Sequence, residues 1–211
     1  MSVLSRAFID RSLAARQRLA DAYAWHRALW QAFPGQDGEP RRFLFRVDDQ
    51  HEVLRVLLLS EAAPVDLAWC CWETRQVAPG FLDHERFAFD LRANPTVKRA
   101  ACAPDGTLRR QGRRVGIHDD AQLREWLVRK GAQSGFTVDA DQLMVGAPVA
   151  DHFTQPAPQL GGRARRGKHM RVDFQGVLQV TDAAAFAVAF RRGIGSAKAF
   201  GFGLLMLQPL A

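Results

Sequence analysis

The order in which strand-like and helix-like segments alternate is the feature that most constrains this fold. Residues 17 to 33 place apolar side chains on one helical face, and Pro34 and Gly35 end the pattern. A strand-like segment precedes this helix at residues 3 to 9, and two more follow it at 41 to 47 and 53 to 60. Residues 64 to 77 are ambiguous and could hold a second helix, and residues 86 to 93 alternate as a strand does. This order is typical of a ferredoxin-like domain.

The second half of the chain repeats the order, although no sequence repeat is visible. It begins with a predicted strand at residues 113 to 117 and a helix capped by Asp119 or Asp120. Strand-like segments follow at residues 136 to 154 and 169 to 180, then a helix from Thr181-Asp182 to Gly193 and a final strand at 203 to 210. We therefore predict an α+β protein of two tandem ferredoxin-like (RRM-like) domains. With 211 residues, the expected division is 1–94 and 95–211, and residues 95 to 112 form a linker or long loop.

Positive charge is concentrated in two stretches of the sequence. Residues 92 to 114 carry seven Lys or Arg and one acid, and residues 160 to 171 carry five and none. The two stretches together carry a net charge of +11, so the rest of the chain, whose total is +7, carries −4. A localised basic surface on a mildly acidic protein is typical of a polyanion site, where neutralised phosphates release counterions. A solvated surface rich in arginine is the alternative.

Nothing in the sequence points to a membrane, a metal or a cofactor. The N-terminal residues lack the apolar core of a leader peptide, and no stretch approaches the roughly 20 apolar residues of a membrane span. We therefore expect a cytoplasmic protein with no membrane partner. The cysteines form no CxxC pair and the six histidines form no i, i+4 pair, so we expect no metal and no cofactor.

A glycine-rich run, GIGSAKAFGFGLL, lies near the end of the sequence. It comes too late for a dinucleotide-binding fold, Lys198 lacks the following Ser or Thr of a P-loop, and the partial RNP1 match lacks the helix and strand that should follow. We predict a loop whose bare backbone N–H groups receive the phosphates of a polymer, while a tight turn explains one or two glycines. The candidate phosphate contacts are Ser196 and Lys198 together with Gly193, Gly195, Gly201 and Gly203.

These motifs together resemble the CasE-type CRISPR RNA endoribonucleases of the RAMP superfamily. GIGSAKAFGFGLL fits the glycine-rich loop of that superfamily, YAWHRALWQAFP fits the family's N-terminal helix, and FLFRV and FDLRANP fit its following strands. The resemblance covers nearly the whole chain. It implies a metal-independent cut at the 3′ base of the stem-loop in each CRISPR repeat, with the product retained among the other subunits of the Cascade surveillance complex.

His26 and Tyr23 are the candidate catalytic residues. Metal-free RNA cleavage needs a base for the 2′-OH proton, an acid for the leaving 5′-oxygen, and cations or N–H donors for the phosphorane charge. The products are a 2′,3′-cyclic phosphate or a 3′-phosphate. His26 titrates near neutrality, and Tyr23 precedes it by three residues on the same helical face. From the residues alone, His26 could simply pack in the apolar stripe; the resemblance implies that it is the catalytic histidine, and Tyr23 is its partner or a packing residue.

The stretch QPAPQLGGRARRGKHMR matches, by location, the basic hairpin that this family inserts along its RNA stem. Its basic residues are Arg163, Arg165, Arg166, Lys168 and Arg171. The deep major groove of A-form RNA excludes side-chain readout, so we expect phosphate contacts. A further set comprises Arg92, Arg109, Arg110, Arg113 and Arg114. The alternatives to an endoribonuclease are a non-catalytic RNA-binding RAMP subunit and a protein scaffold that binds nucleic acid incidentally.

Overall fold

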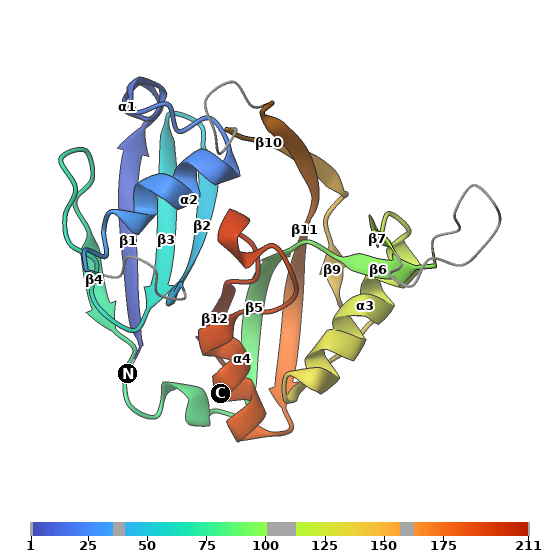
Figure 1. The fold of residues 1–211 in the computed structure, drawn as a ribbon. Coiled ribbons are helices and arrows are strands. Elements are labelled where there is room, and N and C mark those ends of the chain that lie inside the picture. Colours follow the sequence, from blue (N-terminus) through green and yellow to red (C-terminus); the bar gives the residue numbers. More distant parts are fainter. Residues whose placement is uncertain (1, 36–40, 101–112, 157–162, 211) are drawn as a thin grey trace, which may run out of the picture.

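The computed structural model describes residues 2–35, 41–100, 113–156 and 163–210, and it contains two main antiparallel sheets (Figure 1). The first sheet has the order β2-β3-β1-β4. Its strands are β1 (Val3–Asp10), β2 (Phe43–Gln50), β3 (Val53–Ser60) and β4 (Glu73–Gln76). The helices α1 (Arg11–Arg16) and α2 (Ala22–Trp30) cover one face, because alternate residues of β1 such as Ala7 and Ile9 turn their side chains toward them.

The second sheet has the order β10-β11-β5-β12, and β8 and β9 also pair with β11. Its strands are β5 (Arg86–Ala93), β8 (Phe136–Val138), β9 (Met144–Val145), β10 (Val149–Gln155), β11 (Arg165–Val180) and β12 (Leu205–Pro209). The helices α3 (Asp120–Gln133) and α4 (Ala183–Arg192) pack on this sheet through aromatic and aliphatic side chains, among them Trp126, Phe174 and Phe186. The predicted fold class, α+β with two ferredoxin-like halves, is confirmed.

The assignment of the strand at 86–93 to the first half is wrong. β5 pairs with β11 and with β12, so it belongs to the second sheet, and β4 closes the first. The sheets therefore divide between residues 76 and 86, before the expected boundary at residue 94. The segment 64–77, where the sequence allowed a second helix, holds β4 and a Leu67–Cys70 bridge. β7 (Arg113–Gly116) pairs with β6 (Thr96–Arg99), within the expected linker, in a separate small sheet.

The two main sheets are joined by an ion-pair network and an apolar cluster. Arg46 of β2 forms two hydrogen bonds with Asp90 of β5, at 2.6 and 3.2 Å, and its Nε donates to Asp48 at 2.6 Å. Beside this network, Leu44 and Leu59 of the first sheet pack with Phe190 of α4. Opposite charges and apolar surface are thus buried together, and this holds the two halves in a defined orientation.

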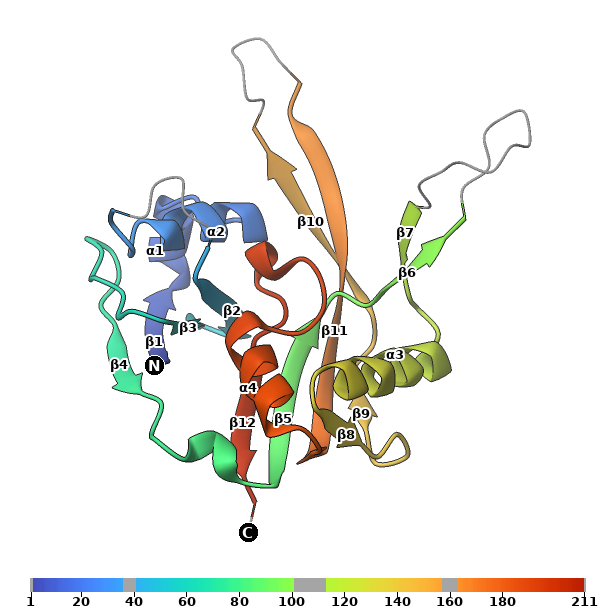
Figure 2. The same ribbon diagram turned by 60° about the horizontal axis from the view of Figure 1, so that its bottom comes forward.

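A long hairpin of β10 and β11 projects from the body of the molecule (Figure 2). The C-terminal half of β11 pairs with β5, from Val172 opposite Ala93 onward, whereas its N-terminal half pairs only with β10 in the described residues. Two 3-10 turns complete the fold, η1 (Phe81–Asp83) and η2 (Lys198–Phe200), and η2 packs against α2 and β2. None of the helices in the described part of the chain is long and apolar enough to span a membrane.

Candidate functional site

His26 lies half-buried on α2 at the rim of an aromatic cluster. Asp21 caps the N-terminus of the helix, because its carboxylate accepts a hydrogen bond from the backbone N–H of Ala24 at 2.8 Å. The His26 ring meets Trp30 edge-on, with ring centroids 5.6 Å apart, and lies 6.2 Å from the ring of Phe43. Its Nδ1 is buried and has no hydrogen-bond partner among the described residues. The ring is therefore held by packing, and its Nδ1 is not committed to a structural bond within the described part of the chain.

Burial lowers the pKa of His26, and the positive charge of Arg41 lowers it further. Both effects disfavour the imidazolium form. The ring is consequently neutral at neutral pH, in the state that can accept a proton.

Arg41 is a neighbour of His26 that the sequence did not indicate. Its Nη1 donates a hydrogen bond to the backbone carbonyl of Lys198 at 2.7 Å, and its guanidinium lies 5.5 Å from the centre of the Phe43 ring. Burial lowers the pKa of Arg41 to about 10, so it remains charged at neutral pH. Because Arg41 precedes β2 and Lys198 opens η2, this contact brings a fixed positive charge and the glycine-rich loop beside the histidine.

Tyr23 lies on the same helix, half-buried and one turn before His26. The predicted helix is thus confirmed around both residues, although it is shorter than the expected 17–33. Residues three apart on a helix share a side, so the phenol and the imidazole can face one substrate.

The glycine-rich loop is built by backbone geometry. Gly193, Gly195, Gly201 and Gly203 all have positive φ, at 75°, 83°, 82° and 87°. The expectation that a tight turn would explain only one or two of them is wrong, because L side chains rarely adopt this conformation. The amides of Gly193 and Gly203 are also not bare, since they donate to the carbonyls of Ala189 and Arg92 at 2.7 and 2.8 Å.

The side chains of the loop have different surroundings. The Ser196 hydroxyl is tied to Asn94, with Oγ 3.2 Å from its carbonyl oxygen and 3.3 Å from its Nδ2. Burial lowers the pKa of Lys198, and the neighbouring charges of Arg41, Arg192 and Lys130 lower it further. Lys198 is therefore a partly buried cation of the loop that lies among other positive charges.

The basic residues of the hairpin do not form one patch. Arg163, Arg165, Arg166 and Lys168 are exposed, whereas Arg171 lies 3.7 Å from the carboxylate of Asp151. Side chains alternate along a strand, so Arg165 and Arg171 share one face of β11 and Arg166 and Lys168 share the other. Each face borders a hollow: Arg171 lines one of about 390 Å³, and Lys168 lines another of about 570 Å³.

An aromatic cluster attaches the root of the hairpin to the glycine-rich loop. The rings of Phe153 and His169 stack with centroids 4.9 Å apart, and Phe200 of η2 lies 4.4 and 4.6 Å from them. The second carboxylate oxygen of Asp21 accepts a hydrogen bond from the backbone N–H of Thr154 at 2.9 Å. The hairpin, the loop and the helix of His26 therefore meet at one place, and Asp21 both caps α2 and connects it to the hairpin.

Other predicted residues have different places. Arg92 binds Asp173 and the carbonyl of Val47, so it contributes to the contact between the sheets. Arg109 and Arg110 lie outside the described residues. Within the described ranges, no three His, Cys, Asp or Glu side chains are grouped closely enough to hold a metal ion.

Two ferredoxin-like sheets, a histidine on α2 and a glycine-rich loop beside it define the class of this protein, and comparison with known proteins agrees. A family model described as "CRISPR associated protein" matches residues 3–209. The chain is 32% identical to the CRISPR system Cascade subunit CasE of Escherichia coli (strain K12), over 96% of this chain and 100% of that protein. It is 30% identical to the CRISPR-associated endoribonuclease Cse3 of Thermus thermophilus, over 94% and 95% of the two chains.

A solved structure of CRISPR endoribonuclease Cse3 bound to 19 nt RNA has the same fold. Its TM-score is 0.79 at 26% identity, and the match covers 98% of this chain and 100% of that one. The chain belongs to the CRISPR-associated protein family, and the predicted resemblance to its CasE-type members is confirmed.

Proposed function

We propose that this protein is an endoribonuclease that binds the stem-loop of CRISPR repeats and cuts precursor CRISPR RNA at the 3′ base of the stem. The observation that carries the proposal is the placement of a neutral, uncommitted imidazole, His26, beside the fixed charge of Arg41. The cut needs no metal ion, because side chains supply the proton transfer and the charge. The relatives named as Cascade subunit and endoribonuclease support this reading.

In the proposed mechanism, His26 accepts the proton of the attacking 2′-hydroxyl. The 2′-oxygen bonds to phosphorus while the bond to the leaving 5′-oxygen breaks and that oxygen takes a proton from water, which leaves a 2′,3′-cyclic phosphate and a 5′-hydroxyl. Arg41 stabilises the negative charge that grows on the phosphorane oxygens, since its guanidinium is already desolvated and oriented. Tyr23, one turn before His26, hydrogen-bonds the same nucleotide.

The stem lies against the hairpin in this proposal. Arg163, Arg165, Arg166 and Lys168 are exposed there and contact phosphates, while Lys198 contacts the strand near the cut. Gly193, Gly195, Gly201 and Gly203 support this loop by their backbone conformation, with Ser196 anchored to Asn94. The other subunits of the surveillance complex are the proposed protein partners, and the cytoplasm, where precursor RNA is made, is the proposed location.

The test is cleavage of the cognate repeat stem-loop by the full chain in EDTA, with the product ends mapped. We expect one cut at the 3′ base of the stem. In His26→Ala the single-turnover rate should fall by about 10²–10⁴-fold, while the dissociation constant stays within about threefold, a difference worth less than about 0.7 kcal/mol. His84→Ala, at an exposed histidine beside η1, is the matched control and should cleave normally.

Two results would contradict the proposal. Tight stem-loop binding by the wild type without any cut would make the chain the non-catalytic RNA-binding subunit. Equal affinity for the stem-loop and for unrelated RNA would favour the other alternative, a protein scaffold that binds nucleic acid incidentally.

A further inference from the structure

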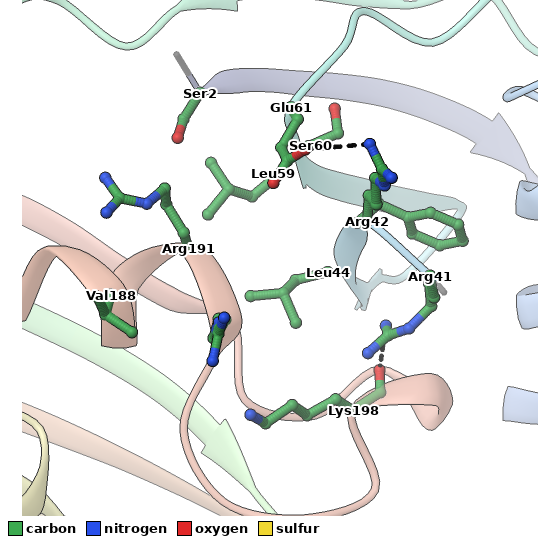
Figure 3. A pocket seen from close by; sticks show the side chains of 12 residues that line it. Ser2, Arg41, Arg42, Leu44, Leu59, Ser60, Glu61, Val188, Arg191 and Lys198 are labelled. Carbon is green, nitrogen blue, oxygen red and sulfur yellow. Dashed lines mark hydrogen bonds and ion pairs between the residues drawn. The ribbon is translucent and has the colours of Figure 1, made fainter. Parts of the chain in front are cut away.

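A second basic feature lies next to the site, on the far side of Arg41. It is a pocket of about 480 Å³ between the start of β2, the end of β3, the C-terminal end of α4 and η2 (Figure 3). Of the described residues that line it, five are basic and one is acidic. These are Arg41, Arg42, Arg191, Arg192 and Lys198, with Glu61. We refer to it as the basic pocket.

The charge of the basic pocket is only partly balanced by its single acidic residue. Glu61 lies 3.9 Å from Arg42, and both side chains are more than half exposed, so this ion pair is weak. Arg191 and Arg192 stand in the last turn of α4, where the helix dipole favours positive charge. Burial lowers the pKa of Lys198, and repulsion from Arg41, Arg192 and Lys130 lowers it further. An anion that entered the pocket would relieve this repulsion.

The pocket also offers apolar surface. Leu44 and Leu59 line it between the cations, as Figure 3 shows, and Val188 lies at its edge. Its volume falls within the range of about 300–1,000 Å³ that is usual for ligand sites. Cations beside apolar side chains suit a nucleotide unit, whose phosphate is anionic and whose sugar and base bury apolar surface.

The basic pocket and the hairpin approach the helix of His26 through different residues. The hairpin meets the N-cap of α2, where the backbone N–H of Thr154 donates to Asp21, whereas the pocket includes Arg41, directly before β2, whose charge acts on His26. A strand that leaves a stem on the hairpin and passes His26 therefore reaches Arg41 and Lys198 next. Those two residues belong to both the site and the pocket.

We propose that the basic pocket binds the phosphates of single-stranded RNA on the 3′ side of the cut. This inference rests on the proposed function, because the direction of the strand follows from a stem on the hairpin and a cut at its 3′ base. The pocket holds the leaving strand, whereas the hairpin holds the stem. Substrate is thereby bound on both sides of the scissile phosphate, and the cleaved 3′ fragment loses its covalent link to the stem and dissociates.

The test compares two RNAs that carry a 2′-deoxynucleotide at the cut position, which removes the nucleophile. One ends at the cut position, and the other continues for about six nucleotides on the 3′ side, enough to span a typical single-strand site. The double variant Arg191→Ala/Arg192→Ala should bind the extended RNA about tenfold more weakly and the short RNA with unchanged affinity. Its salt slope on the extended RNA should fall by about 1.4, because each single-strand phosphate that is no longer neutralised lowers the slope by about 0.7.

Arg16→Ala is the matched control, because Arg16 is an exposed arginine on α1, at the opposite end of β1 from the pocket residue Ser2. Arg16→Ala should leave the difference in affinity between the extended and the short RNA unchanged. Equal weakening of both RNAs by the double variant would place the stem in the pocket and overturn the inference. If the double variant bound both RNAs normally but no longer assembled into the surveillance complex, the inference would be overturned, and the pocket would instead bind an acidic surface of a protein subunit.

These outcomes are separable from failure of the proposed function. If the wild type does not cut the all-ribose stem-loop, the function fails. The binding comparison between the two deoxy-substituted RNAs still decides whether the pocket takes the 3′ strand.

Discussion

The guanidinium of Arg41 donates a hydrogen bond to the backbone carbonyl of Lys198, across 157 positions of sequence, at 2.7 Å. This contact fixes the position of η2 relative to β2, and through η2 the position of the glycine-rich loop relative to α2. Because Arg41 also lowers the pKa of His26, one side chain links the backbone of the loop to the protonation state of the histidine.

Replacing Arg41 should therefore alter both the rate and its pH dependence. In Arg41→Ala we expect cleavage to slow by about 10²–10³-fold, the usual effect of losing one group that stabilises transition-state charge. The pKa of His26 should rise because a neighbouring positive charge is gone, so the midpoint of the rise in rate with pH should move to higher pH. Arg41→Lys keeps the charge and should keep the midpoint. Single-turnover rates between pH 5 and 8 measure both the rate and the midpoint. An unmoved midpoint in Arg41→Ala would contradict the effect of Arg41 on the pKa of His26.

The longer elements were predictable from sequence because they depend on local periodicity, whereas the short elements α1, β4 and β6 were not. Asp21 and Asp182 cap α2 and α4, and the second of these caps was predicted. The pairing of β5 was not predictable, because an alternating strand pattern shows which side chains face the core but not which sheet the strand joins. Its partners lie at residues 172–179 and 205–209, far along the chain.

The candidate site was predictable only in part for the same reason. The helix around His26 and Tyr23 and the glycine-rich loop have local sequence patterns, and the structure has a helix and a loop there. The roles of these residues in cleavage stay predictions, which came from the family resemblance. Arg41 lies at the start of a strand among ordinary charged residues, and its role depends on a tertiary contact. The aromatic cluster of Phe153, His169 and Phe200 likewise joins residues from separate elements, so no spacing rule could indicate it.

Stability should decrease as the pH falls below about 6.5, the ordinary pKa of histidine. Burial lowers the pKa of both His26 and His169, and Asp151 offsets part of this effect at His169. The unfolded chain therefore binds protons that the folded chain does not, and the free energy of unfolding decreases from that pH downward through the folded-state values. His169→Phe, which retains a ring for the stack with Phe153, should flatten this dependence in urea titrations between pH 7 and 5. The exposed His84→Phe is the control, and equal flattening by both variants would refute the assignment.

Gly203→Ala should destabilise the protein strongly. Gly203 has φ of 87°, and an added Cβ would lie 2.6 Å from the carbonyl oxygen of Ile194. Gly35→Ala is the matched control, because its φ of 78° is similar but its Cβ would meet no atom of the described residues within 4 Å. We expect a loss of about 1–2 kcal/mol for Gly35→Ala from backbone strain alone, and at least about 1 kcal/mol more for Gly203→Ala from the added steric contact. Urea denaturation compares the two, and similar losses would show that the loop can rearrange.

Gly167→Ala should disturb the root of the hairpin without unfolding the body. The added Cβ would lie 2.3 Å from Cζ of Phe153, so the ring must leave its stack with His169. We expect weaker binding of the repeat stem-loop, by about tenfold, a cost of about 1.4 kcal/mol, with a cooperative thermal transition retained. The double variant Gly167→Ala/Phe153→Ala removes the clash but does not restore the stack. If it binds as weakly as the single variant, the stack positions the hairpin, whereas full recovery would mean that only the clash mattered.

Neutralising the hairpin should lower both the affinity for the stem-loop and its dependence on salt. Arg163, Arg165 and Arg166 are exposed, so their charges are available to phosphates, and each phosphate that is no longer neutralised should reduce the salt slope by about 0.7–0.9. Arg171→Ala should have a smaller effect, because the Arg171 guanidinium is already 3.7 Å from Asp151. Dissociation constants measured between 50 and 300 mM salt, a range in which electrostatic binding changes by roughly 10³-fold or more, give the slopes. A triple variant Arg163→Ala/Arg165→Ala/Arg166→Ala with the slope of the wild type would show that the stem binds elsewhere on the molecule.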